Sequence, residues 1–500
     1  MTQLLPHSPT APTSTIQAWK RCMSLAQRCT TMRQLKPIHA SFLVHGLHHQ
    51  NYAISKLLAF CALSDTGSLS YASLIFSHTQ TPNLFIYNTI MRGYSRSSQP
   101  QLTLHYFLLM LKASNLAPDH HSFHFVLLAC ANARLVLEGK QVHNCVMKNG
   151  LVLHMQTAVI RFYVKCKVLD DAQKVFDENP CLDVIQWNVL MNGYVKCNLA
   201  FEALKLFRHM LALGGEPDEF CVTTVLTACA RMEALSQGKW IHEYVKKRKG
   251  MELDVFVATA LVDMYAKCGC LDMAEEVFER MPKRNVFSWA AMIGGLAVHG
   301  YATKAIYCLE RMQVDDGLRP DGVVLLGVLM ACTHAGLQEE GQLLLNNMES
   351  RYGIIPQHEH YSCMVDLLCR AGQLDEALQL IRRMPMKPLA SVWGALLSGC
   401  QIRNNVNVAE LAVRELVALE NDYGAEEDGV YVQLANIYLS ARRVEDARRI
   451  RRMIGDRRLK KTPGCSMIEV DGKVNEFVSG DVSHFHRAQI CAMLELLSLE

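Results

Sequence analysis

Short polar side chains recur along this chain just ahead of apolar helical patterns, and their chemistry is that of hydrogen-bond acceptors. They are spaced 31 to 36 residues apart, with one position skipped: Asn83, Asp119, Asp183, Asp218, Asp254, Asn285 and Asp321. An Asp or Asn oxygen at the start of a helix accepts a hydrogen bond from the first free backbone amides. The simplest interpretation of these residues is therefore a series of helix N-caps.

The residue types that perform catalysis do not combine into a recognisable site. A zinc-dependent nucleobase deaminase needs H-x-E followed by P-C-x-x-C, and none of the 19 cysteines belongs to a C-x-x-C pair. The sequence also lacks a Walker-type glycine loop and a Gly-x-Ser-x-Gly elbow. His143 and His242 recur in separate repeats, and we expect them to pack rather than to bind a metal. We predict no catalytic residue, no metal site and no cofactor.

Composition limits the class of protein. A chain of 500 residues, 50% of them hydrophobic, is expected to form several domains or a repeat array. No apolar run approaches the roughly 18 residues that span a membrane. A formal net charge of +3 is too small to identify a nucleic-acid-binding protein by itself. The cysteines favour free, buried thiols in a reducing compartment over disulfides.

The N-terminal segment is basic, rich in Ser and Thr, and free of acidic residues until Asp65. This composition is typical of an organelle transit peptide. We therefore predict that residues 1–16 form a transit peptide or a disordered segment, and that helical repeats start soon afterwards. A disordered tail without a targeting role is the alternative.

Internal repetition organises the rest of the chain. Ala-Cys recurs about every hundred residues, at 129–130, 228–229 and 331–332, and each such period divides into three units. Each unit has two apolar helical patterns separated by Gly or a polar turn. The predicted units are 17–50, 51–83, 84–119, 120–152, 153–183, 184–218, 219–254, 255–285, 286–321, 322–357 and 358–389.

A helical hairpin of this size cannot bury its own apolar face, so neighbouring hairpins must cover it. The pattern therefore predicts an all-α fold, a right-handed α-solenoid whose first helices line one concave surface. The break at Lys267, Cys268 and Gly269 is interpreted as the turn between the two helices of one hairpin.

After residue 389 the period weakens but continues. Residues 390–461 contain two further helix pairs, with an acidic, Gly-containing loop at 421–428 between them and a basic run at 442–461. We interpret the basic run either as a solvated helix face or as an auxiliary phosphate contact. In the last segment, 462–500, Asp471-Gly472 separates two short apolar alternations and predicts a β-hairpin.

Recurring motifs give this chain a resemblance to a known family. They are Gly-Lys-x-x-His at 139–143 and 238–242, Tyr-Ala-Lys-Cys-Gly at 265–269, Val-Trp-Gly-Ala-Leu-Leu at 392–397 and Pro-Gly-Cys-Ser at 463–466. The chain resembles the pentatricopeptide repeat (PPR) family, specifically the plant PLS subfamily of the E/E+ class without a DYW domain. The resemblance implies a repeat array at 17–389, an E domain at 390–461 and an E+ extension at 462–500.

The resemblance also implies that each unit reads one base of single-stranded RNA through its fifth and last residues. Amide and hydroxyl groups there can form hydrogen bonds with a base edge. The second residue of a unit, such as Phe85, Ile185 or Phe256, would pack against base faces. The pairs assigned in this way are Ser55 with Asn83, Asn88 with Asp119, Thr157 with Asp183, Asn188 with Asp218, Thr223 with Asp254, and Thr259 with Asn285.

The assigned pairs resemble known base codes. The Ser-Asn and Thr-Asn pairs resemble the adenine code, the two Asn-Asp pairs the pyrimidine code, and the Thr-Asp pair at 157 and 183 the guanine code. Since the N-terminus of such arrays lies toward the RNA 5′ end, the implied target contains 5′-A-Y-n-G-Y-n-A. The last three units, 286–389, depart from strong codes.

For function, the resemblance implies a sequence-specific RNA-binding protein that is not an enzyme and that specifies sites of C-to-U editing in organelle transcripts. The implied partners are single-stranded organelle RNA and, in trans, a DYW-type deaminase and editing accessory proteins recruited through residues 390–500. No membrane and no small-molecule substrate are expected. We expect location in the mitochondrion, with the chloroplast as the alternative. An organelle splicing, stability or translation factor and a protein-interaction scaffold are the other functions left open.

Overall fold

The computed structural model of the protein forms two compact units, Met1–Pro217 and Asp218–Glu500, each of which is considered by itself. The residues that the structure describes are 13–113, 116–179, 182–248, 254–423, 428–456, 465–470, 473–480, 482 and 486–497. Most of the predicted transit segment 1–16 lies outside these residues. The first helix nevertheless begins within that segment, at Thr13.

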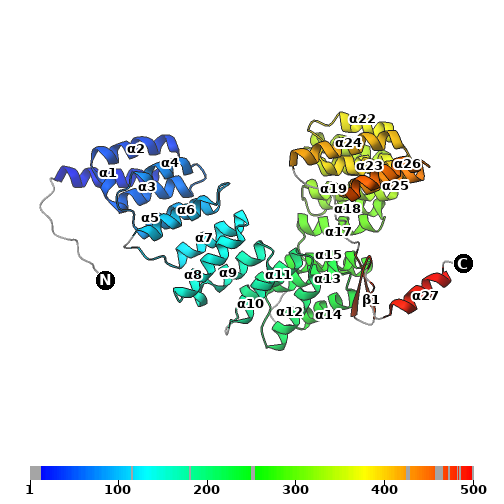
Figure 1. The fold of residues 1–500 in the computed structure, drawn as a ribbon, viewed down its shortest axis with the longest axis horizontal. Helices are drawn as coiled ribbons and strands as arrows, with labels where there is room; N and C mark the ends of the chain where they lie inside the picture. Colours follow the sequence, from blue (N-terminus) through cyan, green and yellow to red (C-terminus); the bar gives the residue numbers. More distant parts are fainter. Residues whose placement is uncertain are drawn as a thin grey trace. The chain divides into compact units, whose positions relative to one another are not determined.

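The first unit is a series of helical hairpins, in blue to green in Figure 1. A 3₁₀ turn, η1 (Leu47–His49), precedes the second hairpin. The helices, paired in chain order, are α1 (Thr13–Arg28), α2 (Met32–Val44), α3 (Asn51–Leu63), α4 (Leu69–Ser77), α5 (Leu84–Ser95), α6 (Leu102–Lys112), α7 (His120–Ala133), α8 (Val136–Lys148), α9 (Val152–Lys165), α10 (Leu169–Asp177), α11 (Val184–Lys196) and α12 (Ala200–Ala212).

The second unit continues the same construction and ends in a strand pair and a last helix (Figure 1). Its elements are α13 (Glu219–Arg231), α14 (Leu235–Lys247), α15 (Val255–Lys267), α16 (Leu271–Glu279), α17 (Val286–Val298), α18 (Ala302–Val314), α19 (Gly322–Ala335), α20 (Gln338–Tyr352), α21 (His358–Ala371), α22 (Leu374–Arg382), α23 (Ala390–Arg403), α24 (Val406–Tyr423), α25 (Asp428–Ser440), α26 (Val444–Asp456), β1 (Cys465–Val470), β2 (Lys473–Val478) and α27 (Arg487–Leu497).

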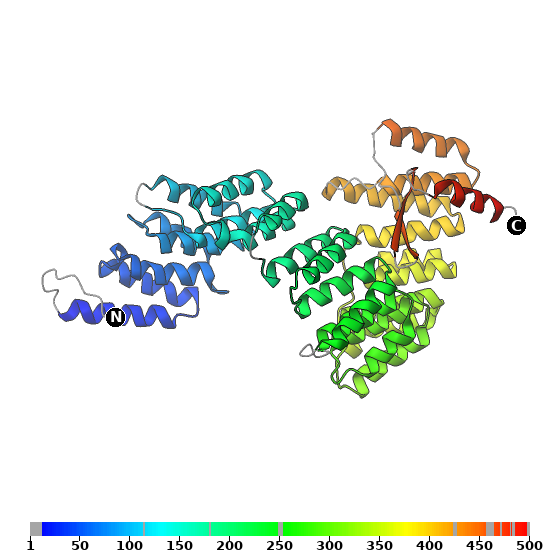
Figure 2. The same ribbon diagram turned by 90° about the horizontal axis from the view of Figure 1, so that it is seen from below.

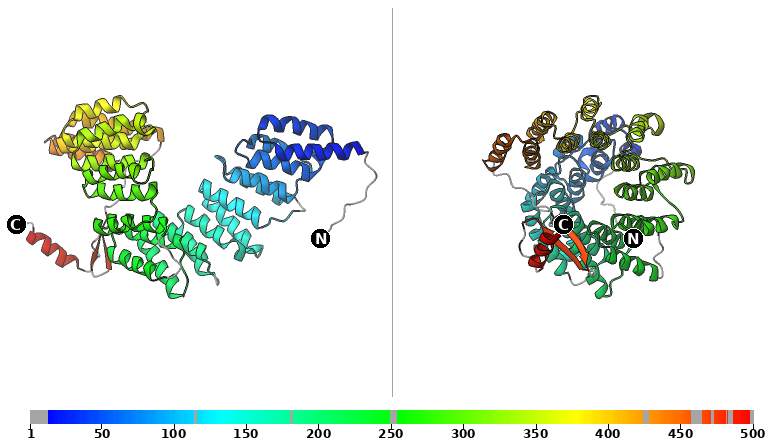
Figure 3. Two further views of the ribbon diagram at one scale, coloured as in Figure 1. Left: turned by 180° about the vertical axis from the view of Figure 1, so that it is seen from behind. Right: turned by 90° about the vertical axis from the view of Figure 1, so that its right-hand side faces the viewer.

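Stacking follows one rule in both units. Within each unit, neighbouring first helices pack against one another, as α5 does with α3 and α7, and α15 with α13 and α17. Within each unit, a second helix contacts its own first helix and, where another hairpin follows, the first helix of that hairpin, as α6 does with α5 and α7. Figures 2 and 3 show the paired helices side by side within each unit. The predicted all-α solenoid is therefore confirmed, and its first helices form a continuous layer in each unit, the first-helix layer.

The predicted unit boundaries coincide closely with the helices. The first helix of each hairpin from α3 to α21 begins at the first residue of a predicted unit, except that α9 begins at Val152, one residue early. In α9 and α15 the buried and half-buried positions nevertheless repeat in the same order, which places Thr157 level with Thr259. The predicted register of unit 153–183 is thus correct, because burial rather than the terminal residue of a helix defines it.

Turn chemistry explains how each hairpin closes. After α15, Gly269 adopts the left-handed conformation (φ 75°), and the Cys270 amide donates to the Tyr265 carbonyl at 2.9 Å. In the hairpin of α9 and α10, Lys167 adopts the same conformation with φ 60°. Glycine enters this region without steric cost. The Lys-Cys-Gly break is therefore the turn that the sequence predicted.

The Gly-Lys-x-x-His motif is a packing motif. A Cβ atom on Gly139 would lie 2.0 Å from Phe162 Cζ, so α8 can approach α9 only with glycine there. His143 Nδ1 hydrogen-bonds with the Tyr163 hydroxyl at 3.1 Å. His242 repeats this contact one period later and hydrogen-bonds with the Tyr265 hydroxyl at 2.8 Å. Both histidines are therefore packing residues, as predicted.

The C-terminal part confirms the β-hairpin and narrows the edges of one predicted loop. Strands β1 and β2 pair antiparallel, with Val470 opposite Lys473. The acidic stretch 421–428 was predicted to be a loop, yet α24 continues through Tyr423 and α25 begins at Asp428. Residues 424–427 lie outside the described part. None of the helices that the structure describes is both long and apolar enough to cross a membrane.

Candidate nucleic-acid interface

The predicted last residues of the units are helix N-caps. Asn83, Asp119, Asp183, Asp218, Asp254 and Asn285 each precede a first helix, and each accepts a hydrogen bond from the backbone amide three residues later. These bonds are 2.7 to 3.0 Å long. The cap therefore fixes the side chain at the start of the helix, where one oxygen is used by the helix itself.

Asn88 and Asp119 show that a predicted pair meets in space. Asn88 Nδ2 donates to Asp119 Oδ1 at 3.0 Å, although the two residues are separated by 31 positions. Ser122 Oγ donates to Asn88 Oδ1 at 2.7 Å, and the Ser122 amide donates to Asp119 Oδ1 at 2.8 Å. Burial alone would raise the pKa of Asp119, but the hydrogen bonds from Ser122 and Asn88 outweigh it and lower the pKa. The carboxylate therefore remains ionised and oriented.

Thr157 and Asp183 are linked through a third side chain. Gln186 Nε2 donates to Thr157 Oγ1 at 3.3 Å, and the Gln186 amide donates to Asp183 Oδ1 at 2.7 Å. The Asp183 amide donates in return to Gln186 Oε1 at 3.2 Å, which completes a capping box. The fifth and last residues of this unit are thus held in one network.

In the second compact unit, Asp218–Glu500, several of the predicted residues line a groove. Its volume is about 610 Å³, and its walls come from the first helices α13, α15, α17 and α19. Thr223, Asp254 and Thr259 all lie in its wall, together with Ala290. Asn285 is not among the lining residues. Consecutive predicted positions therefore face one continuous space.

Exposed apolar side chains mark the second position of the first helices. Phe256 is 69% exposed and Phe287 is 70% exposed, and both line the groove with Phe220 and Val323. Phe85 and Ile185 are also exposed, and each is the second residue of its repeat in the first compact unit, Met1–Pro217. The free-energy cost of leaving large apolar groups in water at one fixed register indicates a surface that a ligand covers.

The hydroxyl groups at fifth positions bond back to their own helices. Thr223 donates to the Phe220 carbonyl at 3.0 Å, and Thr259 donates to the Val255 carbonyl at 2.6 Å. Each oxygen keeps lone pairs that can accept a further hydrogen bond. Ser55 differs because it is buried, with 6% of its surface exposed, and its hydroxyl donates to the Tyr52 carbonyl at 2.7 Å. Its contact with a ligand thus stays a prediction.

The assigned pair Asn188 with Asp218 is divided between the two compact units. Asn188 lies in α11 at a half-buried position, and Asp218 caps α13 by accepting from the Cys221 amide at 2.8 Å. The assignment of these two residues as a pair thus stays a prediction.

The sequence analysis did not identify the side chains of Ser122 and Gln186 as part of the predicted site. Ser122 and Gln186 connect the predicted residues to one another. The signal that could have found them is the capping-box spacing, a cap residue followed three positions later by a polar side chain. Asp119 with Ser122, and Asp183 with Gln186, both satisfy this spacing.

The structure describes no catalytic constellation around this surface. Within the described residues, no group of three or more His, Cys, Asp or Glu side chains could hold a metal ion. The cysteines whose side chains the structure describes are free, and burial raises the pKa of the Cys130 and Cys400 thiols to about 12. Such thiols are poor nucleophiles near neutral pH. The chemistry available on the first-helix layer is therefore hydrogen bonding and stacking.

Family models match five stretches of the array and one stretch beyond it. A PPR repeat model matches residues 85–114, 256–286 and 287–316, a second matches 352–385, and a PPR repeat family model matches 182–231. An E motif model matches 403–469. Pentatricopeptide repeat-containing protein At3g28640 of Arabidopsis thaliana is 57% identical over 97% of each chain. This chain belongs to the pentatricopeptide repeat family. A second Arabidopsis PPR protein, At2g20540, is 37% identical over 94% of this chain and 93% of its own.

Solved PPR structures share the fold. The crystal structure of PPR10 in complex with an 18-nt psaJ RNA element superposes with a TM-score of 0.62 at 18% identity. The match covers 85% of this PPR chain and 65% of PPR10. At this identity the likeness concerns the fold, and it agrees with stacked hairpins whose first helices form one layer.

Proposed function

We propose that this PPR protein binds single-stranded RNA along its first-helix layer, with one unit facing one base. The observation that carries the proposal is the groove that Thr223, Asp254 and Thr259 line between exposed aromatic side chains. A groove lined by both polar and exposed apolar side chains suits a row of splayed bases, whose edges form hydrogen bonds and whose faces stack. The RNA bound by PPR10 supports the same ligand class.

The hydrogen-bond state of the side chains supports the base assignments. In this structure the Thr259 hydroxyl donates to the Val255 carbonyl, which leaves its oxygen available to accept from a ligand. The exocyclic amine of adenine is a donor, which agrees with the adenine assignment of Thr259 with Asn285. Asp254 caps α15 through Oδ1, and its Oδ2 makes no hydrogen bond with the described residues, which leaves an acceptor for a ligand.

We propose further that the protein is a site-recognition factor for C-to-U editing of organelle transcripts. The E motif at 403–469 supports this role over splicing, stability or translation, and over a purely protein-binding scaffold. A DYW-type deaminase with accessory proteins, recruited through residues 390–500, would supply the chemistry. Related Arabidopsis PPR proteins carry the designations mitochondrial and chloroplastic, which supports an organelle and leaves our preference for the mitochondrion to be tested.

Binding to short RNAs tests the recognition step. We expect the oligonucleotide 5′-A-Y-n-G-Y-n-A to bind more tightly than a scrambled sequence of the same composition in a gel-shift assay. The Asn88→Ala variant should lose the preference at the second base only, because its contact with Asp119 lies in one unit; the cost should be on the order of 1 kcal/mol. Equal binding of target and scrambled RNA would refute base reading.

Transcript sequencing tests the editing step. In a plant that lacks the protein, we expect one or a few edited cytosines downstream of matching sequences to remain unedited. Normal editing at every site, combined with unspliced introns or shifted transcript ends, would replace the editing proposal with the processing alternative.

A further inference from the structure

The residue before the cap differs between units. Six units carry proline there, immediately ahead of the last residue: Pro82, Pro118, Pro217, Pro320, Pro356 and Pro388. Proline fixes φ near −65° and limits the conformations of the connection. The unit 255–285 carries Arg284 at this place instead. Its connection to α17 is held by side-chain contacts of Arg284.

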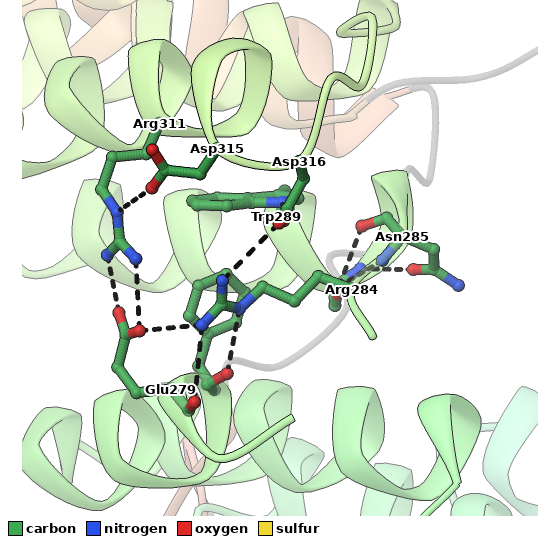
Figure 4. Close-up of polar contacts among 9 residues, drawn as sticks. Glu279, Arg284, Asn285, Trp289, Arg311, Asp315 and Asp316 are labelled. Carbon is green, nitrogen blue, oxygen red and sulfur yellow. Dashed lines mark hydrogen bonds and ion pairs between the residues drawn. The ribbon is translucent and has the colours of Figure 1, made fainter. Parts of the chain in front are cut away.

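Arg284 folds back onto the helix that precedes it (Figure 4). Its Nε donates to the Phe278 carbonyl at 3.2 Å, and Nη2 donates to Glu279 Oε2 at 2.8 Å. The guanidinium lies 4.8 Å from the centre of the Phe278 ring and 5.7 Å from that of Trp289. Its side chain is only 14% exposed. A buried, stacked and hydrogen-bonded guanidinium has one defined position.

The partners of Arg284 are themselves tied to the next hairpin. Arg311 of α18 forms two hydrogen bonds with Glu279, at 2.6 and 3.2 Å. The hydrogen bond from Arg311 is the main reason that the pKa of Glu279 is lowered, so this carboxylate stays charged. Trp289 Nε1 donates to Asp316 Oδ2 at 2.7 Å (Figure 4). The network thus joins α16, α17 and α18 around Arg284.

Asn285 follows Arg284 directly in the chain. Its Oδ1 accepts from the Ser288 amide at 2.9 Å, and its own amide donates to Ser288 Oγ at 2.9 Å. The orientation of this cap depends on the path of residues 282–284, because the connection has no regular structure of its own. Whatever fixes Arg284 therefore also fixes the place of Asn285.

We propose that Arg284 is a positioning residue for base selection by the unit 255–285. Through its contacts it does for Asn285 what the proline ring does for the caps of six other units. The inference rests on the proposed function, because it concerns how Asn285 and Thr259 face an RNA base. The Arg284 amide makes no hydrogen bond with the described residues, so proline can replace this residue without loss of a backbone bond.

Three variants of the full-length protein test this role. Arg284→Gln removes the charge and the stacking, Arg284→Pro restores a rigid connection by other means, and Arg280→Gln is the control. Arg280 lies beside the network, where it is exposed and paired with Glu276 at 2.8 Å. For each variant, binding is measured to the target RNA with all four bases at the position assigned to the unit 255–285, and separately at the position assigned to the unit 84–119.

We expect Arg284→Gln to reduce the adenine preference several-fold at the first of these positions and to leave the preference at the second unchanged. Arg284→Pro should recover most of the adenine preference, and Arg280→Gln should retain all of it. Hydrogen exchange supplies a readout without RNA. The Ser288 amide, which Asn285 caps, should exchange faster in Arg284→Gln than in the wild type and in Arg280→Gln.

The outcomes separate the inference from the function on which it rests. If the wild type prefers no base at any position, the proposed function is overturned and the inference with it. If the wild type reads bases but Arg284→Gln keeps its adenine preference and its Ser288 protection, only the inference is overturned. A uniform loss of affinity at every position would also overturn it, because that result assigns Arg284 to general stability.

Discussion

At the scale of single residues, the helix cap Asp119 also lies on the proposed RNA surface. Asp119 caps α7, and it is held by Asn88 and Ser122 at the same time. A side chain that is already oriented loses little conformational entropy when a ligand binds, so preorganisation strengthens binding. N-cap and base reader are therefore compatible roles for the same residue rather than alternatives.

Burial of His242 predicts a pH dependence of stability. Burial is the main cause that lowers the pKa of His242 from 6.5 to about 4, and Lys246 adds to it. The unfolded chain binds this proton more readily than the folded protein does. The free energy of unfolding therefore has its full value above pH 6.5 and decreases by up to about 3 kcal/mol as the pH falls toward 4. Thermal unfolding between pH 4 and 7 should show a flatter profile for His242→Gln than for the wild type.

The matched control for this prediction is His105→Gln. His105 is exposed on α6, so its replacement should leave the wild-type pH profile in place. Parallel profiles for the wild type and His242→Gln would show that burial does not exclude the proton from His242.

At the scale of helices, close packing between hairpins depends on glycine at chosen positions. Gly139 meets the Phe162 ring and Gly238 meets Met264, one period apart. Gly294, in the middle of α17, has nothing within 4 Å of the place where a Cβ would stand. Helix propensity alone would favour alanine at every one of these positions. The side chains packed against each glycine determine whether that position tolerates alanine.

We predict opposite effects for two chemically identical substitutions. Gly139→Ala should destabilise the protein by about 1–3 kcal/mol, because a rigid ring occupies the space that the methyl group needs. Gly294→Ala should be neutral or should stabilise by up to about 1 kcal/mol. Urea unfolding of both variants measures the difference. Equal stabilities would show that α8 and α9 separate at little cost.

At the scale of the whole molecule, the net charge is only +3, yet the C-terminal run 442–461 carries a local excess of cations. Arg443, Arg448 and Arg449 of the C-terminal basic run form ion pairs with neighbouring carboxylates. Arg451 and Arg452, on the exposed side of α26, make no ion pair with the residues that the structure describes. Unpaired guanidinium groups suit phosphates, which is the second of the two interpretations that the sequence left open.

The Arg451→Gln/Arg452→Gln variant is expected to bind RNA more weakly and with a smaller dependence on salt. Removing one phosphate contact should reduce the slope of log affinity against log salt by about 0.7 for a single strand. Base preference should not change, because phosphate contacts carry no sequence information. The control variant Lys205→Gln/Lys246→Gln removes two cations that are already paired with Glu202 and Glu243. Equal slopes of log affinity against log salt for both variants would show that the basic run 442–461 is a solvated helix face.

The sequence by itself determined the repeats of this protein. Unit length, cap residues and apolar periodicity are local properties, and they placed the start of α5 at Leu84 and of α15 at Val255 correctly. The motif histidines and the turn at Gly269 were also predictable, because they recur in equivalent positions. The predicted loop at 421–428 was too wide at its edges, because α24 extends through Tyr423 and α25 begins at Asp428.

Only the tertiary structure decided which side chains meet across repeats. Asn88 forms a hydrogen bond with Asp119, 31 positions away. The Ser55 hydroxyl donates to a carbonyl of its own helix. Arg284 joins a network with α16 and α18. Periodicity states which face of a helix a residue occupies, but not the distance to a side chain of the next hairpin. That distance depends on how closely the helices stack, and the stacking is set by every residue in the contact together.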